Sequence, residues 1–172
     1  MKKRHTITVL TENTPGVLHR ITSVFTKRKV NIESLTVSET EHEEISRFTV
    51  VFYSEPEFVS QLVRPIQKIV EVVDAFASDD ETLLYKEIAF LRVGFSSEWE
   101  RADIEKMATK NNGKVILANG RTMVIEITGE EDEVDRFRDM LKAYPLKTFV
   151  RSGRIAIKRE LTEELLDHTL DE

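Results

Sequence analysis

The first residues of the chain alternate between polar and apolar side chains. Across residues 5–10, threonines alternate with isoleucine and valine, which is the period of a strand with one buried face. A turn signal follows at residues 13–16, where Asn, Thr, Pro and Gly succeed one another. Apolar residues then recur at three- and four-residue spacing until about Arg28, which predicts an amphipathic helix. These residues are Val17, Leu18, Ile21, Val24 and Phe25.

Two further strands and a second helix complete the first half. Residues 31–39 and 45–53 alternate in the same way and are rich in Thr, Val and Phe, which predicts two strands joined by an acidic turn. A helical stripe begins near Pro56, and Pro65 within it predicts a kink or an early end. Residues 72–77 form a fourth strand. The order is βαββαβ, which is typical of ferredoxin-like folds.

The second half repeats this order after an acidic interruption at residues 78–82. The pattern predicts a strand at residues 86–95, and a helix at residues 98–111 that is stopped by an Asn-Gly pair. A hairpin centred on residues 119–121 and another helical stripe follow, and residues 160–170 predict a polar helix. The remaining strands are predicted at residues 114–118, 123–128 and 147–151, and the stripe consists of Val134, Phe137, Met140 and Leu141.

The pattern therefore predicts an α+β protein with two ferredoxin-like βαββαβ domains. We assign residues 1–78 to the first domain, residues 79–85 to a linker, and residues 86–172 to a second domain with a helical tail. Each four-stranded sheet would carry its helices on one face only. The other face, rich in β-branched residues, would need a partner, which predicts oligomerisation.

The composition narrows the classes of function. The chain has 172 residues, a net charge of −6, 4 histidines and no cysteine. The acidic balance argues against a nucleic-acid binder, whose affinity depends on clustered Lys and Arg. No apolar run approaches the roughly 18 to 20 residues that cross a bilayer, so we expect a cytoplasmic protein that contacts no membrane. The histidines lack the spacing of metal ligands and no nucleophile or phosphate-loop motif occurs, so we expect no catalytic and no metal-binding residues.

The turn before the first helix offers chemistry that suits a small anionic ligand. Gly16 lets the backbone approach a ligand closely, and the free N–H groups of a helix N-terminus favour a carboxylate. Asn13 and Asn31 each carry amide donors and a carbonyl acceptor, which suit the α-carboxylate and α-ammonium groups of an amino acid. The same residues also suit a turn, a helix start and a strand start without any ligand. Both interpretations stay open on these residues alone.

A longer string favours the first interpretation. Residues 10–18, with Arg20, Phe25 and Arg28, and the run Asn-Ile-Glu-Ser-Leu-Thr-Val at residues 31–37 resemble an ACT domain. More narrowly, these segments resemble the small regulatory subunits of acetolactate synthase, also called acetohydroxyacid synthase. The resemblance spans essentially the whole chain.

The resemblance implies a protein that is not an enzyme on its own. Members of this family bind the catalytic subunit, raise its activity and confer feedback inhibition by valine, in the biosynthesis of valine, leucine and isoleucine. Their effector site lies between two ACT domains of a homodimer. Thiamine diphosphate, Mg²⁺ and FAD are expected on the catalytic partner, and no cofactor is expected on this chain. Carried over by position, the effector contacts are Asn13, Gly16, Val17, Leu18, Asn31 and Ile32.

One position departs from the family pattern. The family usually has glycine two residues before the asparagine that opens the second strand, and here that residue is Lys29. If the position requires a positive φ, lysine costs roughly 1 kcal/mol or more there. The turn into the second strand is therefore where the resemblance is least secure.

Other functions fit parts of the pattern. RNA-binding modules also have a ferredoxin-like order, and Phe48 and Phe52 share one predicted strand, but the acidic charge argues against RNA. An ACT-domain regulator of a different amino-acid enzyme stays open as the alternative. The sequence also leaves open which branched-chain amino acid is preferred and the stoichiometry with the catalytic subunit. The second domain around Trp99 and the leucine-bearing tail are the expected contact surface for that subunit.

Overall fold

The computed structural model of the chain describes residues 2–159. The chain divides into two compact units, each described below by itself. The first unit contains the residues up to Tyr85 together with the segment that begins at Arg154, and the second is Lys86–Gly153. Among the described residues, no helix is both long and apolar enough to cross a membrane.

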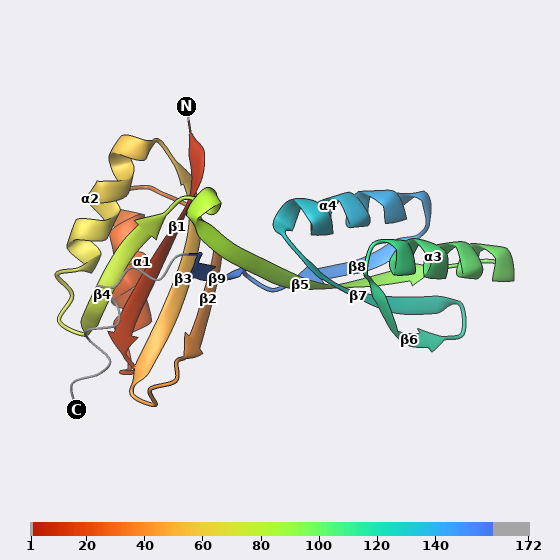
Figure 1. The fold of residues 1–172 in the computed structure, drawn as a ribbon, viewed down its shortest axis with the longest axis horizontal. Coiled ribbons are helices and arrows are strands. Elements are labelled where there is room, and N and C mark those ends of the chain that lie inside the picture. Colours follow the sequence, from red (N-terminus) through yellow and green to blue (C-terminus); the bar gives the residue numbers. More distant parts are fainter. Residues whose placement is uncertain (1, 160–172) are drawn as a thin grey trace. The chain divides into compact units, whose positions relative to one another are not determined.

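The first unit is a four-stranded antiparallel sheet with two helices on one face (Figure 1). The strands lie in the order β2-β3-β1-β4, so β2 and β4 are the edges of the sheet. The βαββαβ order confirms the prediction for an ACT domain. The elements are β1 (Lys3–Glu12), α1 (Val17–Lys27), β2 (Ile32–Glu39), β3 (Ile45–Ser54), α2 (Pro56–Ile66) and β4 (Val72–Ser78).

The core of the first unit follows the periodicity of the sequence. Ile7 and Val9 of β1 alternate toward the helices, as Phe48, Val50 and Phe52 of β3 do, and all five are buried. They pack against the apolar stripes of both helices, and this packing removes the apolar side chains from water. The predicted early end of the second helix is also found: α2 ends at Ile66, one residue after its internal proline.

The opposite face of the first sheet is not open, contrary to expectation. Thr6 and Thr8 of β1 point away from the helices yet are 0% and 3% exposed. The start of β5 (Leu83–Gly94) and the strand β9 (Ile155–Lys158), which pair with each other, lie against this face. The ammonium of Lys158 is 4.0 Å from the centre of the Phe76 ring on β4. Segments of the same chain therefore cover this face of the first sheet.

This return corrects the predicted domain boundaries. Residues 154–159 belong to the first unit, so among the described residues the second unit ends at Gly153 and not at the C-terminus. The expected linker at residues 79–85 is a short 3₁₀ turn, Asp80–Thr82, followed by the first residues of β5. A four-residue strand whose two isoleucines stay exposed gives too weak a pattern to be assigned from the sequence. The predicted helix at residues 160–170 lies outside the described residues.

A buried ion network fixes the point where the chain returns. Arg154 is only 3% exposed, and its guanidinium donates to Asp80 Oδ1 at 2.6 Å and to Thr6 Oγ1 at 3.2 Å. The same guanidinium stacks on the ring of Tyr85, 4.0 Å from its centre. The other oxygen of Asp80 accepts from Arg4 Nη2 at 2.7 Å. One aspartate thus joins the first strand, the exit turn and the returning segment.

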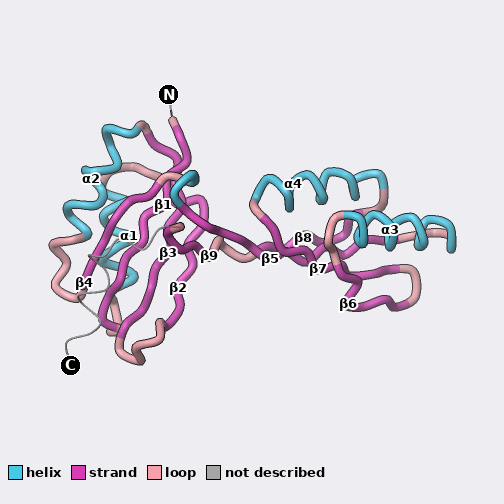
Figure 2. The backbone as a smooth tube through the Cα atoms, in the orientation of Figure 1, coloured by secondary structure: helices cyan, strands magenta, loops and turns pink. Residues whose placement is uncertain are grey.

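The second unit repeats the order of the first. Its helices cover one face of a sheet ordered β6-β7-β5-β8, and Figure 2 shows the strands and helices in separate colours. This confirms the second ferredoxin-like domain. Ile88, Phe90 and Val150 are exposed on the face without helices, and Trp99 is 73% exposed. The elements after β5 are α3 (Glu98–Lys110), β6 (Lys114–Asn119), β7 (Thr122–Gly129), α4 (Glu131–Met140) and β8 (Leu146–Arg151).

Candidate functional site

The loop between β1 and α1 is held by its own backbone. The N–H of Asn13 donates to the carbonyl of Glu44 at 2.7 Å, and the N–H of Thr14 donates to the carbonyl of Glu12 at 2.9 Å. Gly16 is the N-cap of α1 and has a φ of 90°, a conformation that favours glycine. Apart from its two chain neighbours, no atom of the described residues lies within 4 Å of the place where a Cβ of Gly16 would stand. The loop is therefore a fixed turn with open space directly above the start of the helix.

The N-terminus of α1 has no side-chain cap and no acidic residue in its first turn. Helix α2 also lacks a side-chain cap but has Glu57 in its first turn. Ser97 caps α3 by accepting from the N–H of Glu100, and Glu130 and Glu133 form a capping box on α4. Uncapped N–H groups at the positive end of a helix dipole are a favourable place for a carboxylate. The start of α1 is thus well suited to bind the carboxylate of a ligand.

The side chains around this loop have unequal access to a ligand. Leu18 is 44% exposed, but Val17 is only 5% exposed and packs in the core, so it does not offer a ligand its side chain, and its N–H group donates to the carbonyl of Thr14 at 3.5 Å. Asn13 Nδ2 lies 3.4 Å from Oε1 of Glu39, the last residue of β2. Glu39 is a residue that the sequence analysis missed, because 26 positions separate it from Asn13. A carboxylate here offers a partner for an ammonium group.

Asn31 and Ile32 lie at the other end of the sheet. Ile32 pairs with Phe52, which pairs with His5 near the start of β1, whereas Asn13 follows the end of β1. The seven steps from His5 to Glu12 span roughly 23 Å of extended strand. Ile32 is half-buried against the core, and Asn31 is exposed. The six predicted contacts therefore form two groups within one chain, and these groups do not converge on one ligand.

The turn into β2 explains the unusual lysine. The N–H of Val30 donates to the carbonyl of Phe25 at 3.1 Å, and the N–H of Lys29 donates to that of Thr26 at 3.0 Å, the two bonds of a Schellman motif. Its left-handed position is Lys29, with a φ of 56°. Glycine is the usual residue there because it has no Cβ to clash. The position does require a positive φ, so the lysine there is strained.

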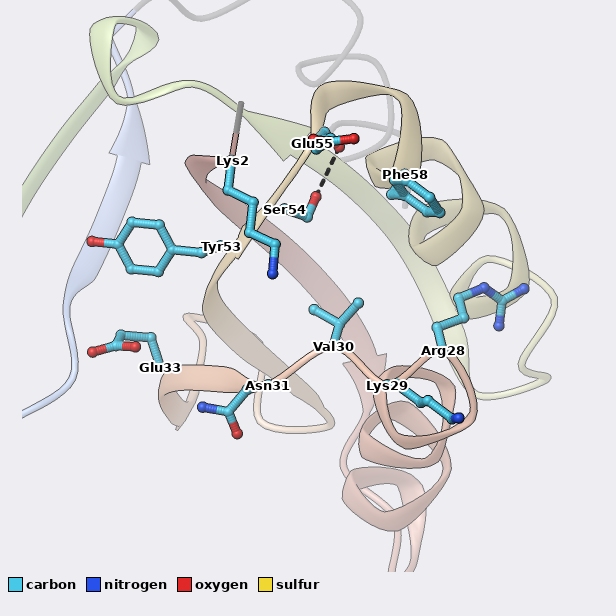
Figure 3. Close-up of a pocket in the computed structure, with 10 residues that line it drawn as sticks. All are labelled: Lys2, Arg28, Lys29, Val30, Asn31, Glu33, Tyr53, Ser54, Glu55 and Phe58. Carbon is cyan, nitrogen blue, oxygen red and sulfur yellow. Dashed lines mark hydrogen bonds between the residues drawn. The ribbon is translucent and has the colours of Figure 1, made fainter.

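A pocket of about 610 Å³ lies at the Asn31 end of the unit (Figure 3). Asn31 lines it together with the end of α1, the end of β3 and the first turn of α2. Figure 3 shows the ammonium of Lys2 directed into the space between Tyr53 and Phe58. The lining residues are Lys2, Arg28, Lys29, Val30, Asn31, Glu33, Tyr53, Ser54, Glu55 and Phe58.

Comparisons with known proteins match both halves of the chain. Residues 7–74 match the family described as AHAS small subunit-like ACT domain, and residues 86–160 match the family described as small subunit of acetolactate synthase. A probable acetolactate synthase small subunit of Archaeoglobus fulgidus is 34% identical over 156 residues, which cover 91% of this chain and 97% of the relative. The chain belongs to the acetolactate synthase small subunit family.

Further members of the acetolactate synthase small subunit family agree with this assignment. The small subunit of Bacillus subtilis is 34% identical over 160 residues, covering 92% of this chain and 91% of its own length. The crystal structure of the small subunit from Thermotoga maritima superposes with a TM-score of 0.84 at 28% identity, covering 93% of this chain and 99% of that one. The resemblance stated from residues 10–18 and 31–37 is thereby confirmed, as is the ACT domain. The relatives are small subunits, which is consistent with a non-catalytic role.

Proposed function

We propose that this chain is the regulatory subunit of an acetolactate synthase: it binds the catalytic subunit, raises its activity and makes it sensitive to inhibition by valine. Matches of both halves to small subunits of acetolactate synthase favour this enzyme over a different amino-acid enzyme. The observation that carries the effector site is the uncapped start of α1, with Gly16 leaving the space above it open. We expect thiamine diphosphate, Mg²⁺ and FAD to bind the catalytic partner.

The position of the two residue groups supports a site shared by two copies. β2 is an edge strand, and the groups lie at its two ends: Asn31 precedes its first residue, and Asn13 contacts its last, Glu39. If two copies pair antiparallel along β2 about a two-fold axis, the start of one β2 lies beside the end of the other. Asn31 of each copy then meets the Gly16 loop of its partner. One dimer would contain two such composite sites.

The chemistry of this composite site fits a free branched-chain amino acid. The N–H groups at the start of α1 bind the α-carboxylate, because that end of the helix carries positive partial charge. The α-ammonium donates to the amide oxygens of Asn13 and Asn31 and faces the carboxylate of Glu39. The exposed side chain of Leu18 supplies an apolar contact for the aliphatic side chain of the ligand.

Inhibition then follows from linkage. An effector held between two ACT domains stabilises one arrangement of the dimer, and a catalytic subunit that prefers another arrangement loses activation. A coupling free energy of about 1–3 kcal/mol changes the apparent affinity by roughly 5- to 150-fold, which is enough for regulation.

The test is to mix the purified chain with acetolactate synthase catalytic subunits and measure activity with and without valine. We expect the wild-type chain to raise activity and to confer inhibition. Gly16→Asp should keep activation and lose inhibition, because its carboxylate would occupy open space and repel that of the effector. Gly16→Ala is the control, since it has the same backbone strain without the charge. Unchanged valine inhibition in Gly16→Asp would refute the site, and an absence of activation would refute the function.

A further inference from the structure

We propose that the second unit binds a second copy of the chain through the face of its sheet that carries no helices. In the first unit, the equivalent face carries Thr6 and Thr8 of β1, which are polar and nevertheless buried under segments of the same chain. In the second unit, Ile88 and Phe90 of β5 take the equivalent places, and both are exposed. The second unit therefore exposes the more apolar of the two faces.

The apolar side chains of this face form two clusters. Residues that lie opposite each other in the register share one face of the sheet. Phe90 lies opposite Val150 of β8, and these two side chains are 41% and 55% exposed. Val124 of β7 lies opposite Leu117 of β6, which is 53% exposed. Exposed apolar clusters that share one face indicate an interaction surface.

Two opposite charges lie between these clusters. Glu126 of β7 lies opposite Phe90, and Arg92 of β5 lies opposite Val124, so the two charged residues are diagonal neighbours on the same face. Lys114 of β6 lies opposite Glu126. Within residues 2–159, none of these three charged side chains takes part in an ion pair. The face thus offers a cation and an anion side by side to another molecule.

This arrangement is complementary to itself. Consider a two-fold axis that lies between two such sheets, parallel to them, and crosses the line from Arg92 to Glu126 at its midpoint and at a right angle. Arg92 of each copy then lies opposite Glu126 of the other, and each apolar cluster lies opposite its own counterpart. With strands about 4.8 Å apart and a rise of about 3.4 Å per residue, the strands of the two copies cross at roughly 70°, which is near the orthogonal class of sheet packing.

The charges favour a second copy over a partner of one charge. An acidic partner would place like charge against Glu126, and a basic partner would place like charge against Arg92. A second copy pairs both residues at once and also covers both apolar clusters. This contact does not rest on the pairing along β2 proposed above, because β2 belongs to the first unit and the present face to the second.

Charge reversal in two separate chains tests this contact. Arg92→Glu gives a face with two negative residues at the centre and Glu126→Arg gives one with two positive residues, so each variant should repel its own copies and attract the other variant. The full-length variants are studied alone and as an equal mixture, without catalytic subunit and at low salt, by sedimentation velocity over a range of concentrations. We expect the mixture to associate at about tenfold lower concentration than either variant alone, since two ion pairs replace two repulsive contacts.

Two further variants serve as comparisons. Phe90→Ser should weaken association by several-fold relative to the wild type, because it removes an apolar side chain from the contact. Lys106→Glu is the matched control: it reverses an exposed charge on α3, which packs on the opposite face of the sheet, and should associate as the wild type does. The urea midpoint of Trp99 fluorescence, measured for each variant, verifies that the second unit is folded.

The outcomes separate this surface from the effector site. A mixture that associates no more strongly than either charge variant alone would overturn the proposal and would assign the face to a different partner, such as the catalytic subunit. Pairing through β2 alone would give this result, because it does not depend on Arg92 or Glu126. Both charge variants should bind valine as the wild type does, since the effector site lies in the first unit. A failure at one surface therefore does not imply a failure at the other.

Discussion

Replacement of Arg154 by methionine tests whether the returning segment stabilises the first unit. Methionine keeps the aliphatic volume of the side chain but removes its charge, which leaves the contacts of Arg154 with Asp80 and Thr6 unmade. Loss of one partner of a buried ion pair usually costs about 3–5 kcal/mol. Asp80 is 25% exposed and keeps its contact with Arg4, which reduces the cost. With the lost stacking on Tyr85 included, we expect a decrease of about 2–3 kcal/mol in the free energy of unfolding.

Urea unfolding followed by two signals makes this test specific. Trp99 is the one tryptophan of the chain and lies in the second unit, so its fluorescence reports on that unit, while far-UV circular dichroism reports on both. Arg154→Met should shift the dichroism transition to lower urea and leave the Trp99 transition nearly unchanged. Arg4→Gln is the comparison: the Arg4 side chain is 19% exposed against 3% for Arg154, so its loss should cost less. If Arg154→Met lowered the free energy of unfolding no more than Arg4→Gln does, the stabilising role of the buried Arg154 would be refuted.

Three further predictions follow from local geometry. Lys29→Gly should raise the free energy of unfolding, measured in urea, by about 1 kcal/mol, because glycine adopts the left-handed conformation without strain. Asn112→Gly should raise it by less, and an unchanged free energy of unfolding in Lys29→Gly would contradict the strain. The N–H of Glu130 and the ammonium of Lys86 lower the pKa of Glu133 below its ordinary value of 4.5, so this carboxylate stabilises the second unit above that pH and the contribution is lost as the pH falls. As the pH is lowered, the urea midpoint followed by Trp99 fluorescence should therefore fall less in Glu133→Gln than in the wild type. An equal fall in both proteins would contradict this role of Glu133. The hydroxyl of Tyr144 donates to Asp103, which raises the pKa of Tyr144 to about 12. Spectrophotometric titration should therefore show a late-ionising tyrosine that Tyr144→Phe removes, and a late phase that persists in Tyr144→Phe would contradict this assignment.

Much of the fold could be predicted because its elements are strongly periodic. Alternation in β1 and β3 and the stripe of α1 correspond directly to the core of the first unit. The element order of both units was correct for the same reason. Strand β9 could not be predicted, since its four residues contribute one buried alanine, Ala156. What holds β9 in place is the buried Arg154, and no local pattern indicates that an arginine will pair with an aspartate 74 positions earlier.

The sequence allowed the local motif of the candidate site to be located, but it did not allow the relative positions of its two residue groups to be predicted. The motif around Gly16 was placed correctly at a helix start, and the positive φ of Gly16 was found only in the structure. No local pattern indicates that Asn13 and Asn31 lie at opposite ends of β2, because this depends on which way α1 runs along the sheet. Glu39, which approaches Asn13 only in the folded chain, was also missed, because its distance along the sequence hides it from any motif.

Complementation between two defective variants tests most directly whether an effector binds between the Gly16 loop of one copy and Asn31 of the other. Gly16→Asp and Asn31→Ala should each fail to bind valine in calorimetric titration when studied alone. In an equal mixture that has exchanged subunits, half of the dimers are mixed and each contains one site with both halves intact, so about a quarter of the sites should bind valine with wild-type affinity. No recovery of valine binding, in a mixture whose exchange into mixed dimers has been verified by mass spectrometry, would contradict the shared site.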